Sequence, residues 1–262
     1  MLASLPATDL LLWAATTSLS VALLAVILLR KQPRYFPFFT AYLSVNLLQT
    51  AFQIFVYNRY GMNSNPAYAL VWGSQALVVV TRSLVAVEFC RGVLARYSGI
   101  WALAIRILLL CASIVFVAAV LFGKDGFRYA VMTLEIGCEA FIAVLVAGTF
   151  VFARYYAVRV EKILALLGLG LGLNSCLRII NDLVLSKYLT MYQYIWNHVG
   201  VATFGVVLVV WITAMKTAAQ PLPTPELLPA QIYRALIPGI NQRLWQLNEH
   251  LINLWKLEQP KL

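Results

Sequence analysis

The sequence predicts an all-α integral membrane protein, built as a bundle of seven transmembrane helices with an amphipathic helix at its C-terminus. Two observations predict this class. The 262 residues are 62% hydrophobic and only 11% charged, an apolar share well above that of ordinary soluble domains. The apolar residues also gather into stretches of about 20, the length that a helix needs to cross a bilayer core about 30 Å thick.

Seven apolar stretches follow one another with short loops between them, and each is predicted to form one transmembrane helix. Their expected bounds are Leu10–Leu29, Phe36–Tyr57, Ala67–Cys90, Gly99–Phe122, Tyr129–Phe152, Ile163–Leu185 and Tyr194–Met215. The chain therefore divides into a seven-helix domain over residues 1–216, a proline-containing linker over 217–239 and a helical tail over 240–262.

Lys and Arg residues are unevenly shared between the two sets of alternating loops. The poorer set holds only Arg59, Lys124, Arg128 and Lys187. The richer set includes Arg30, Lys31, Arg34, Arg91, Arg96, Arg154, Arg159 and Lys162, and the tail adds more. By the positive-inside rule the richer side is cytoplasmic, which predicts an outside N-terminus and a cytoplasmic C-terminus. Topology and anionic lipid headgroups then account for the net charge of +10, and we expect no nucleic-acid partner.

Polar and charged residues interrupt four of the predicted spans at helical spacing and at matching depths. The stretch GLGLGLNSCLRIIND, Gly168 to Asp182, shows the pattern most clearly. A charged residue at the centre of a membrane helix costs about 2.5 to 3.5 kcal/mol on insertion scales, so such residues usually face the bundle interior and mark a site. We therefore expect a polar cavity that opens outward. Its predicted residues are Gln49, Gln53, Glu135, Glu139, Asn174, Arg178, Asp182 and His198.

Alternative roles remain open for several of these residues. Arg178 and Asp182 are spaced for an i,i+4 ion pair that would only fix helix register. Glu135 and Glu139 stack on one helical face, and two carboxylates so placed suit a cation, a proton or a basic ligand. His198 alone is more often a hydrogen-bonded core histidine than a ligand. Gly168 and Gly172 form a G-x-x-x-G pattern, which predicts close helix packing.

A second polar cluster is predicted in the third and fourth spans, from Gln75, Arg82 and Arg106. Both arginines could extend their guanidinium groups toward cytoplasmic headgroups. Alternatively, they bridge to Glu139 or to bound anions and close the floor of the cavity.

Catalytic and cofactor motifs are missing from the sequence. No H-E-x-x-H, G-x-S-x-G or Walker-type loop occurs, and the four cysteines lie in predicted spans without metal-ligand spacing. We expect no cofactor, no metal and no catalytic residue, although an intramembrane enzyme remains a minor alternative.

The tail after the proline-rich linker contains an apolar heptad seam. Leu244, Leu247, Leu251 and Leu254 lie on one helical face, widened by Trp245 and Trp255. Two interpretations compete. The seam could form a short coiled coil with a second copy or a cytoplasmic partner, or the helix could lie in the inner membrane surface. Because two heptads are marginal alone, we favour the membrane surface or a partner-assisted coil.

The plan of seven spans, an outside N-terminus, an outward polar pocket and a cytoplasmic helical extension resembles bacterial seven-helix sensor modules. The stretch RSLVAVEFCRGVLARYSGIW, Arg82 to Trp101, resembles that of uncharacterised bacterial seven-helix proteins. The resemblance covers the chain through about Met215 and implies a sensor or signal relay in the bacterial cytoplasmic membrane. We expect no kinase, cyclase or phosphodiesterase domain after the tail, and signalling would then pass through a separate protein.

Two other functions remain open. The same carboxylates could serve a small-solute or proton-coupled transporter that takes a ligand or cation from the outer side. The charged faces could instead be the contacts of an accessory subunit in a larger membrane complex. No inverted repeat is evident and only Pro37 falls inside a span, whereas broken helices are the usual mark of a midplane transport site.

Overall fold

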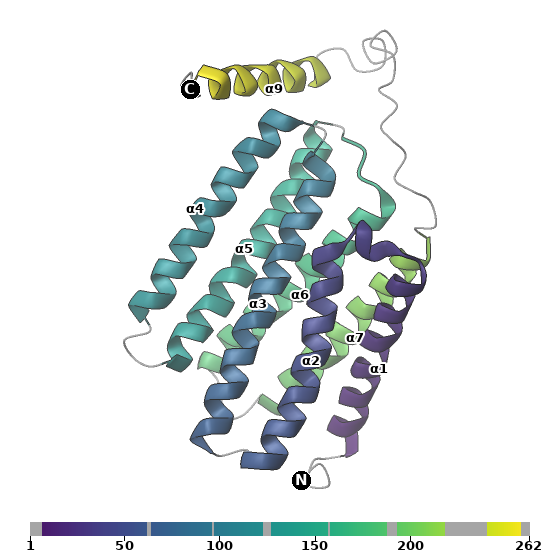
Figure 1. Cartoon of the computed structure of the whole chain (residues 1–262), viewed down its shortest axis with the longest axis vertical. Helices are drawn as coiled ribbons and strands as arrows, with labels where there is room; N and C mark the ends of the chain where they lie inside the picture. The colour runs from purple at the N-terminus through teal and green to yellow at the C-terminus, as the bar shows by residue number, and fades with distance from the viewer. Residues whose placement is uncertain are drawn as a thin grey trace.

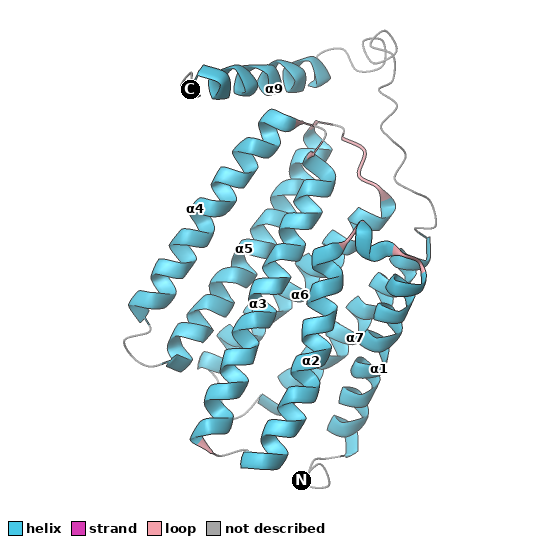
Figure 2. Cartoon of the chain, in the orientation of Figure 1, coloured by secondary structure: helices cyan, strands magenta, loops and turns pink. Residues whose placement is uncertain are grey.

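The computed structural model is all-helical in the part of the chain that it describes, namely residues 7–61, 64–95, 97–122, 127–156, 158–187, 193–217 and 240–257 (Figures 1 and 2). The helices are α1 (Ala7–Leu29), α2 (Pro37–Tyr60), α3 (Asn65–Leu94), α4 (Ser98–Phe122), α5 (Phe127–Tyr155), α6 (Lys162–Lys187), α7 (Gln193–Thr217) and α9 (Ile240–Leu257). A short 3-10 turn, η2 (Gln32–Arg34), joins α1 to α2. Seven of the helices match the seven predicted stretches within a few residues.

Six of these helices are long and apolar enough to cross a membrane, which confirms the class of integral membrane protein. The apolar segments are Leu11–Leu29, Pro37–Tyr60, Gly99–Leu121, Thr133–Tyr155, Lys162–Asn181 and His198–Lys216. Helix α3 is not among them, although at 30 residues it is the longest helix described. It carries Arg82 and Glu88, and both of these side chains are buried against other helices.

Six helices form a closed ring, and α4 stands outside it. Going round the ring, each helix packs against the next in the order α1, α2, α3, α5, α6, α7, and α7 packs back on α1. Helix α4 packs mainly on the outer side of α5, as Figure 1 shows. Sequence neighbours are therefore ring neighbours except at α4, and this exception brings α3 directly against α5.

The half of the ring nearer to α9 is filled by a packed apolar core. Its largest fully buried members are Trp211, Tyr42, Phe39 and Phe89. The Trp211 ring meets the Phe39 ring edge-on at 5.0 Å between centroids. The Trp211 Nε1–H group donates a hydrogen bond of 3.3 Å to the carbonyl of Leu167, one turn into α6.

Small residues on α6 allow this close approach, as the G-x-x-x-G pattern predicts. A Cβ atom added at Gly168 would lie 2.5 Å from the Phe89 ring of α3, and one at Gly172 would lie 3.3 Å from Val146 of α5. Gly170, between them, faces α7, where an added Cβ would lie 2.3 Å from Trp211 Nε1. The predicted packing role of Gly168 and Gly172 is confirmed, and α6 is packed against three neighbours.

Replacing Gly170 by Ala is expected to destabilise the folded protein by about 1 to 3 kcal/mol, because the added methyl group overlaps the fully buried Trp211 ring. The measurement is unfolding of the purified protein by detergent titration, followed by circular dichroism. Gly148→Ala is the matched control, since nothing lies within 4 Å of a Cβ added at that α5 position. Equal stability of the two variants would show that Trp211 moves aside freely.

Helix ends near α9 are capped by side chains from other elements. The Glu88 carboxylate of α3 accepts hydrogen bonds from the backbone N–H groups of Phe38 (3.1 Å) and Phe39 (2.9 Å), at the start of α2. In η2, Gln32 Nε2 donates to the carbonyl of Met215 at 3.2 Å, near the end of α7. These contacts satisfy helix-terminal groups that would otherwise lack partners, and they join α2, α3 and α7 at one end of the bundle.

Helix α9 crosses that end of the bundle, lying over the start of α4 (Figure 1). Its buried side chains are Asn248 and Leu251, and Asn248 Oδ1 accepts a hydrogen bond of 2.8 Å from the Gly99 N–H. The side chains of Trp245, Leu247 and Leu254 remain 40 to 44% exposed. Those of Leu244 and Trp255 lie outside the described residues. The structure thus adds a third role for the tail, an intramolecular contact with α4, beside the two predicted ones.

Candidate functional site

A polar cavity of about 340 Å³ lies inside the helical ring and is lined by residues of α1, α2, α3, α6 and α7. The residues that line it are Trp13, Thr16, Thr17, Ser20, Asn46, Leu47, Gln49, Thr50, Gln53, Gln75, Asn174, Leu177, Arg178, Asn181, Gly200, Val201, Thr203 and Phe204. Most of these side chains are amides or hydroxyls. The lining is therefore unusually polar for the interior of a membrane bundle, where polar groups are rare and mark functional sites.

The cavity occupies the half of the ring that lies away from α9. Its α6 residues, Asn174, Arg178 and Asn181, come after the glycine segment and repeat at about one turn, so they share a face of the second half of the helix. The packed core around Trp211 and Tyr42 fills the other half. The cavity therefore has a floor of buried aromatic side chains between it and the end that carries α9.

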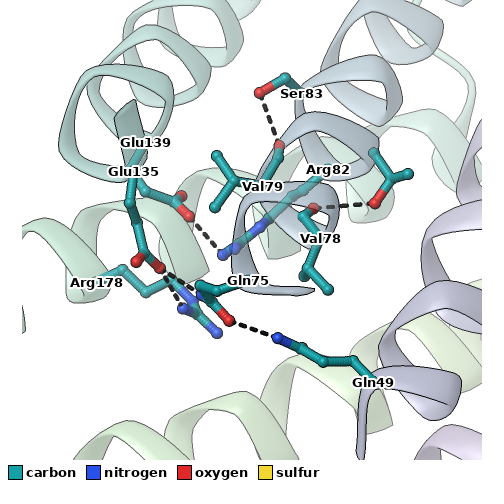
Figure 3. Close-up of polar contacts among 10 residues, drawn as sticks. Gln49, Gln75, Val78, Val79, Arg82, Ser83, Glu135, Glu139 and Arg178 are labelled. Carbon is teal, nitrogen blue, oxygen red and sulfur yellow. Dashed lines mark hydrogen bonds and ion pairs between the residues drawn. The ribbon is translucent and has the colours of Figure 1, made fainter. Parts of the chain in front are cut away.

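A chain of hydrogen bonds runs from the cavity wall into the bundle (Figure 3). Gln49 Nε2 of α2 donates to Gln75 Oε1 of α3 at 2.9 Å. Gln75 Nε2 in turn donates to Glu135 Oε1 of α5 at 2.7 Å, and Arg178 Nη1 of α6 meets the same oxygen at 3.0 Å. This chain connects α2, α3, α5 and α6, and the Glu135 carboxylate accepts two of its hydrogen bonds, which are stronger than neutral ones.

A second ion pair lies one turn further along α5. Arg82 Nη1 of α3 is 2.5 Å from Glu139 Oε1, and both side chains are fully buried (Figure 3). The guanidinium carbon of Arg82 also lies 6.0 Å from the centre of the Tyr42 ring, in cation–π range. Of the two roles expected for Arg82, the structure shows the bridge to Glu139.

The predicted cavity residues fall into three groups. Gln49, Gln53, Asn174 and Arg178 line the cavity, and Glu135 bonds directly to the lining. Glu139 lies below it in the Arg82 pair. His198 is half-buried on α7 and does not belong to the lining, while the side chain of Asp182 lies outside the described residues.

Two details differ from the sequence interpretation. Glu135 and Glu139 do not act as a pair, because each carboxylate faces its own arginine from a different helix. The predicted second cluster also divides: Gln75 joins the cavity, Arg82 joins Glu139, and Arg106 is exposed on α4. Helix α4 stands outside the ring, so it cannot bring Arg106 to the cavity floor.

Sequence reasoning missed the contributions of α1 and of the middle of α7. On α1, Thr16 and Ser20 are four residues apart and line one side of the cavity. Their hydroxyl groups also bond back to the carbonyls of Leu12 and Thr16 at 3.1 and 2.9 Å. Such back-bonding is common for Ser and Thr in membrane helices and does not by itself mark a site. The i,i+4 spacing of the two hydroxyl residues was therefore the one sequence feature that could have indicated that α1 lines a cavity.

Several buried polar atoms at the cavity lack partners among the described residues. Asn174 is 4% exposed, and its Nδ2 donor has no hydrogen-bond partner there. The Oδ1 acceptor of Asn181 is in the same situation two turns further along α6. A buried amide without a partner costs about 1 to 3 kcal/mol, so these atoms have a strong preference for a hydrogen-bonding occupant of the cavity.

Fold and site together define a helical integral membrane protein with a polar cavity in one half of its bundle. Comparison with protein families, curated proteins and solved structures gives no match for this chain.

Proposed function

We propose that the protein is a seven-transmembrane sensor or signal-relay protein of the bacterial cytoplasmic membrane. In this proposal α3 crosses the bilayer in addition to the six apolar helices, which makes seven spans. The N-terminus lies outside and the tail is cytoplasmic. A small ligand enters the polar cavity from the outer side. The tail then relays the bound state to a separate cytoplasmic protein.

The observation that carries this proposal is the division of the ring into a polar cavity and a closed apolar half. Amides, hydroxyls and Arg178 surround the cavity, whereas Phe39, Tyr42 and Trp211 fill the half toward α9. A pocket that ends on a packed floor suits ligand binding from one side. A carrier needs a path that continues to the other side, and the floor closes such a path in this conformation.

Helix α5 offers a physical route from the cavity to the tail end of the bundle. Glu135 contacts the cavity wall and Glu139, one turn on, holds Arg82 of α3. Further along α3, Glu88 caps the start of α2. A ligand that changed the Arg178–Glu135 contact would therefore bias the position of α5 against α3, and α4 connects α5 to α9.

The accessory-subunit alternative has less support. It requires polar faces that point at lipid in the single chain, where a partner would cover them. Gln49, Asn174, Arg178 and Glu135 instead point into the ring and contact one another or the cavity.

Cysteine accessibility tests the proposal. In a background with the four native cysteines replaced by Ala, Asn181→Cys is expected to react with a membrane-impermeant thiol reagent in intact cells and not in inverted vesicles. Gln246→Cys, on the exposed side of α9, is the matched control and should react only in inverted vesicles.

Each other pattern contradicts a specific part of the proposal. Reaction of Asn181→Cys from both sides would indicate a continuous path and favour the transporter. Reaction of Asn181→Cys in inverted vesicles alone, with Gln246→Cys reacting in intact cells, would reverse the proposed orientation.

A further inference from the structure

The charges at the cavity balance among the described residues. Arg178 is the one cation and Glu135 the one anion on or directly bonded to its described lining, and they meet at 3.0 Å. The Arg82–Glu139 pair beneath is balanced in the same way. A charged ligand would bring an uncompensated charge among lining side chains that are mostly neutral amides and hydroxyls, and moving an unpaired charge out of water is costly. The electrostatics thus favour an uncharged occupant.

The unpartnered polar groups of the cavity favour an occupant that can both accept and donate hydrogen bonds. The unpartnered Nδ2 of Asn174 needs an acceptor, and the unpartnered Oδ1 of Asn181 needs a donor. Both lie on the cavity face of α6, about two turns apart. A hydroxyl group can fill either role, and an amide supplies one of each. A ligand with several such groups would satisfy both ends of this face at once.

The volume of the cavity limits the size of its occupant, and the aromatic side chains in its lining favour a particular shape. At about 340 Å³ the cavity lies at the lower end of the range for ligand pockets, about 300 to 1,000 Å³. Trp13 of α1 and Phe204 of α7 also contribute aromatic surface to the lining, against which an apolar ring face could pack.

We propose that the cavity binds a small, uncharged molecule rich in hydroxyl or amide groups, about the size of a monosaccharide. This inference rests on the proposed function, since it names the ligand class of the same cavity. Asn174 and Asn181 would contact the ligand directly, while the Arg178–Glu135 pair would hold the cavity wall without supplying net charge.

The test uses the full chain, purified and placed in lipid nanodiscs, with four probes. Glucose and myo-inositol represent the uncharged class, glutamate an anion and putrescine a cation. Isothermal titration calorimetry is expected to show saturable binding of at least one uncharged probe, with the charged probes at least tenfold weaker. Tighter binding of glutamate or putrescine, or binding of neither uncharged probe, would overturn the ligand class.

Variants locate the binding. Asn174→Leu removes a buried donor and is expected to weaken the uncharged probe about tenfold, as the loss of one buried hydrogen bond implies. Ser175→Ala is the matched control, because Ser175 is equally buried on α6 but does not line the cavity. If Asn174→Leu fails to fold, Asn181→Leu replaces it. Equal affinities in the cavity variant and the control would place binding elsewhere and overturn the proposal.

Hydrogen exchange separates failure of this inference from failure of the proposed function. The bound probe is expected to change amide protection in α9. An uncharged probe that binds in the cavity without any such change would support the ligand class and contradict the sensor. A change in the amide protection of α9 produced by glutamate or putrescine alone would support the sensor and contradict the proposed ligand class.

Discussion

Replacing Arg82 by Met alone is expected to destabilise the folded protein by about 3 to 5 kcal/mol. Glu139 would then be a fully buried carboxylate without its 2.5 Å partner, and breaking one side of a buried pair leaves such an uncompensated charge. Detergent-titration unfolding of the purified protein measures the loss. Glu139→Gln is expected to be destabilising for the same reason, with Arg82 as the unpaired group.

The double variant Arg82→Met/Glu139→Leu provides the control. Removing both charges and keeping apolar side chains of similar size is often neutral or stabilising, so the double variant should recover most of the lost stability. If Arg82→Met alone were as stable as the wild type, water or a mobile side chain would be compensating Glu139, and the packed floor beneath the cavity would be open. That result would also weaken the argument against a transporter.

Function can be separated from stability in the same pair of variants. A stable double variant that still binds an uncharged probe but no longer alters α9 would assign the Arg82–Glu139 pair to signal relay. A double variant with unchanged coupling would make the pair purely structural.

Helix positions were predictable from the sequence because lipid imposes a simple rule on length and composition. Each apolar stretch of about 20 residues becomes a helix, and the observed bounds differ by only a few residues. Helix α3 has the predicted position but is not among the six apolar helices, since Arg82 and Glu88 reduce its apolar content. Those residues are stabilised by Glu139 and by the start of α2, contacts that composition cannot reveal.

Partners across helices were less predictable than the faces on which residues lie. Helical periodicity placed Asn174 and Arg178 correctly on an inward face of α6. It suggested Asp182 as the partner of Arg178, because i,i+4 contacts are the ones a sequence shows. The structure records Glu135 of α5 as a partner, since the order of helices round the ring places α5 beside α6. That order, with α4 outside, is a tertiary property.

Replacing Gly99 by Leu is expected to release α9 from the bundle. A Cβ at Gly99 would lie 2.7 Å from the Asn248 carbonyl oxygen and 3.0 Å from Leu251 Cβ, so a longer side chain cannot fit under the helix. The hydrogen bond from the Gly99 N–H to Asn248 would be lost as well. Because most of the stability of a helix in a protein comes from its tertiary packing, the released α9 should lose most of its amide protection in hydrogen exchange.

Gly73→Leu is the matched control, because Gly73 lies on α3 with nothing within 4 Å of an added Cβ. Retained protection of α9 in Gly99→Leu would show that another surface holds the helix. The exposed Trp245, Leu247 and Leu254 make the membrane surface the natural alternative, and protection would then fall when the protein is moved from nanodiscs into detergent. Loss of protection in Gly99→Leu alone would instead show that the α4–α9 contact holds the helix against the bundle.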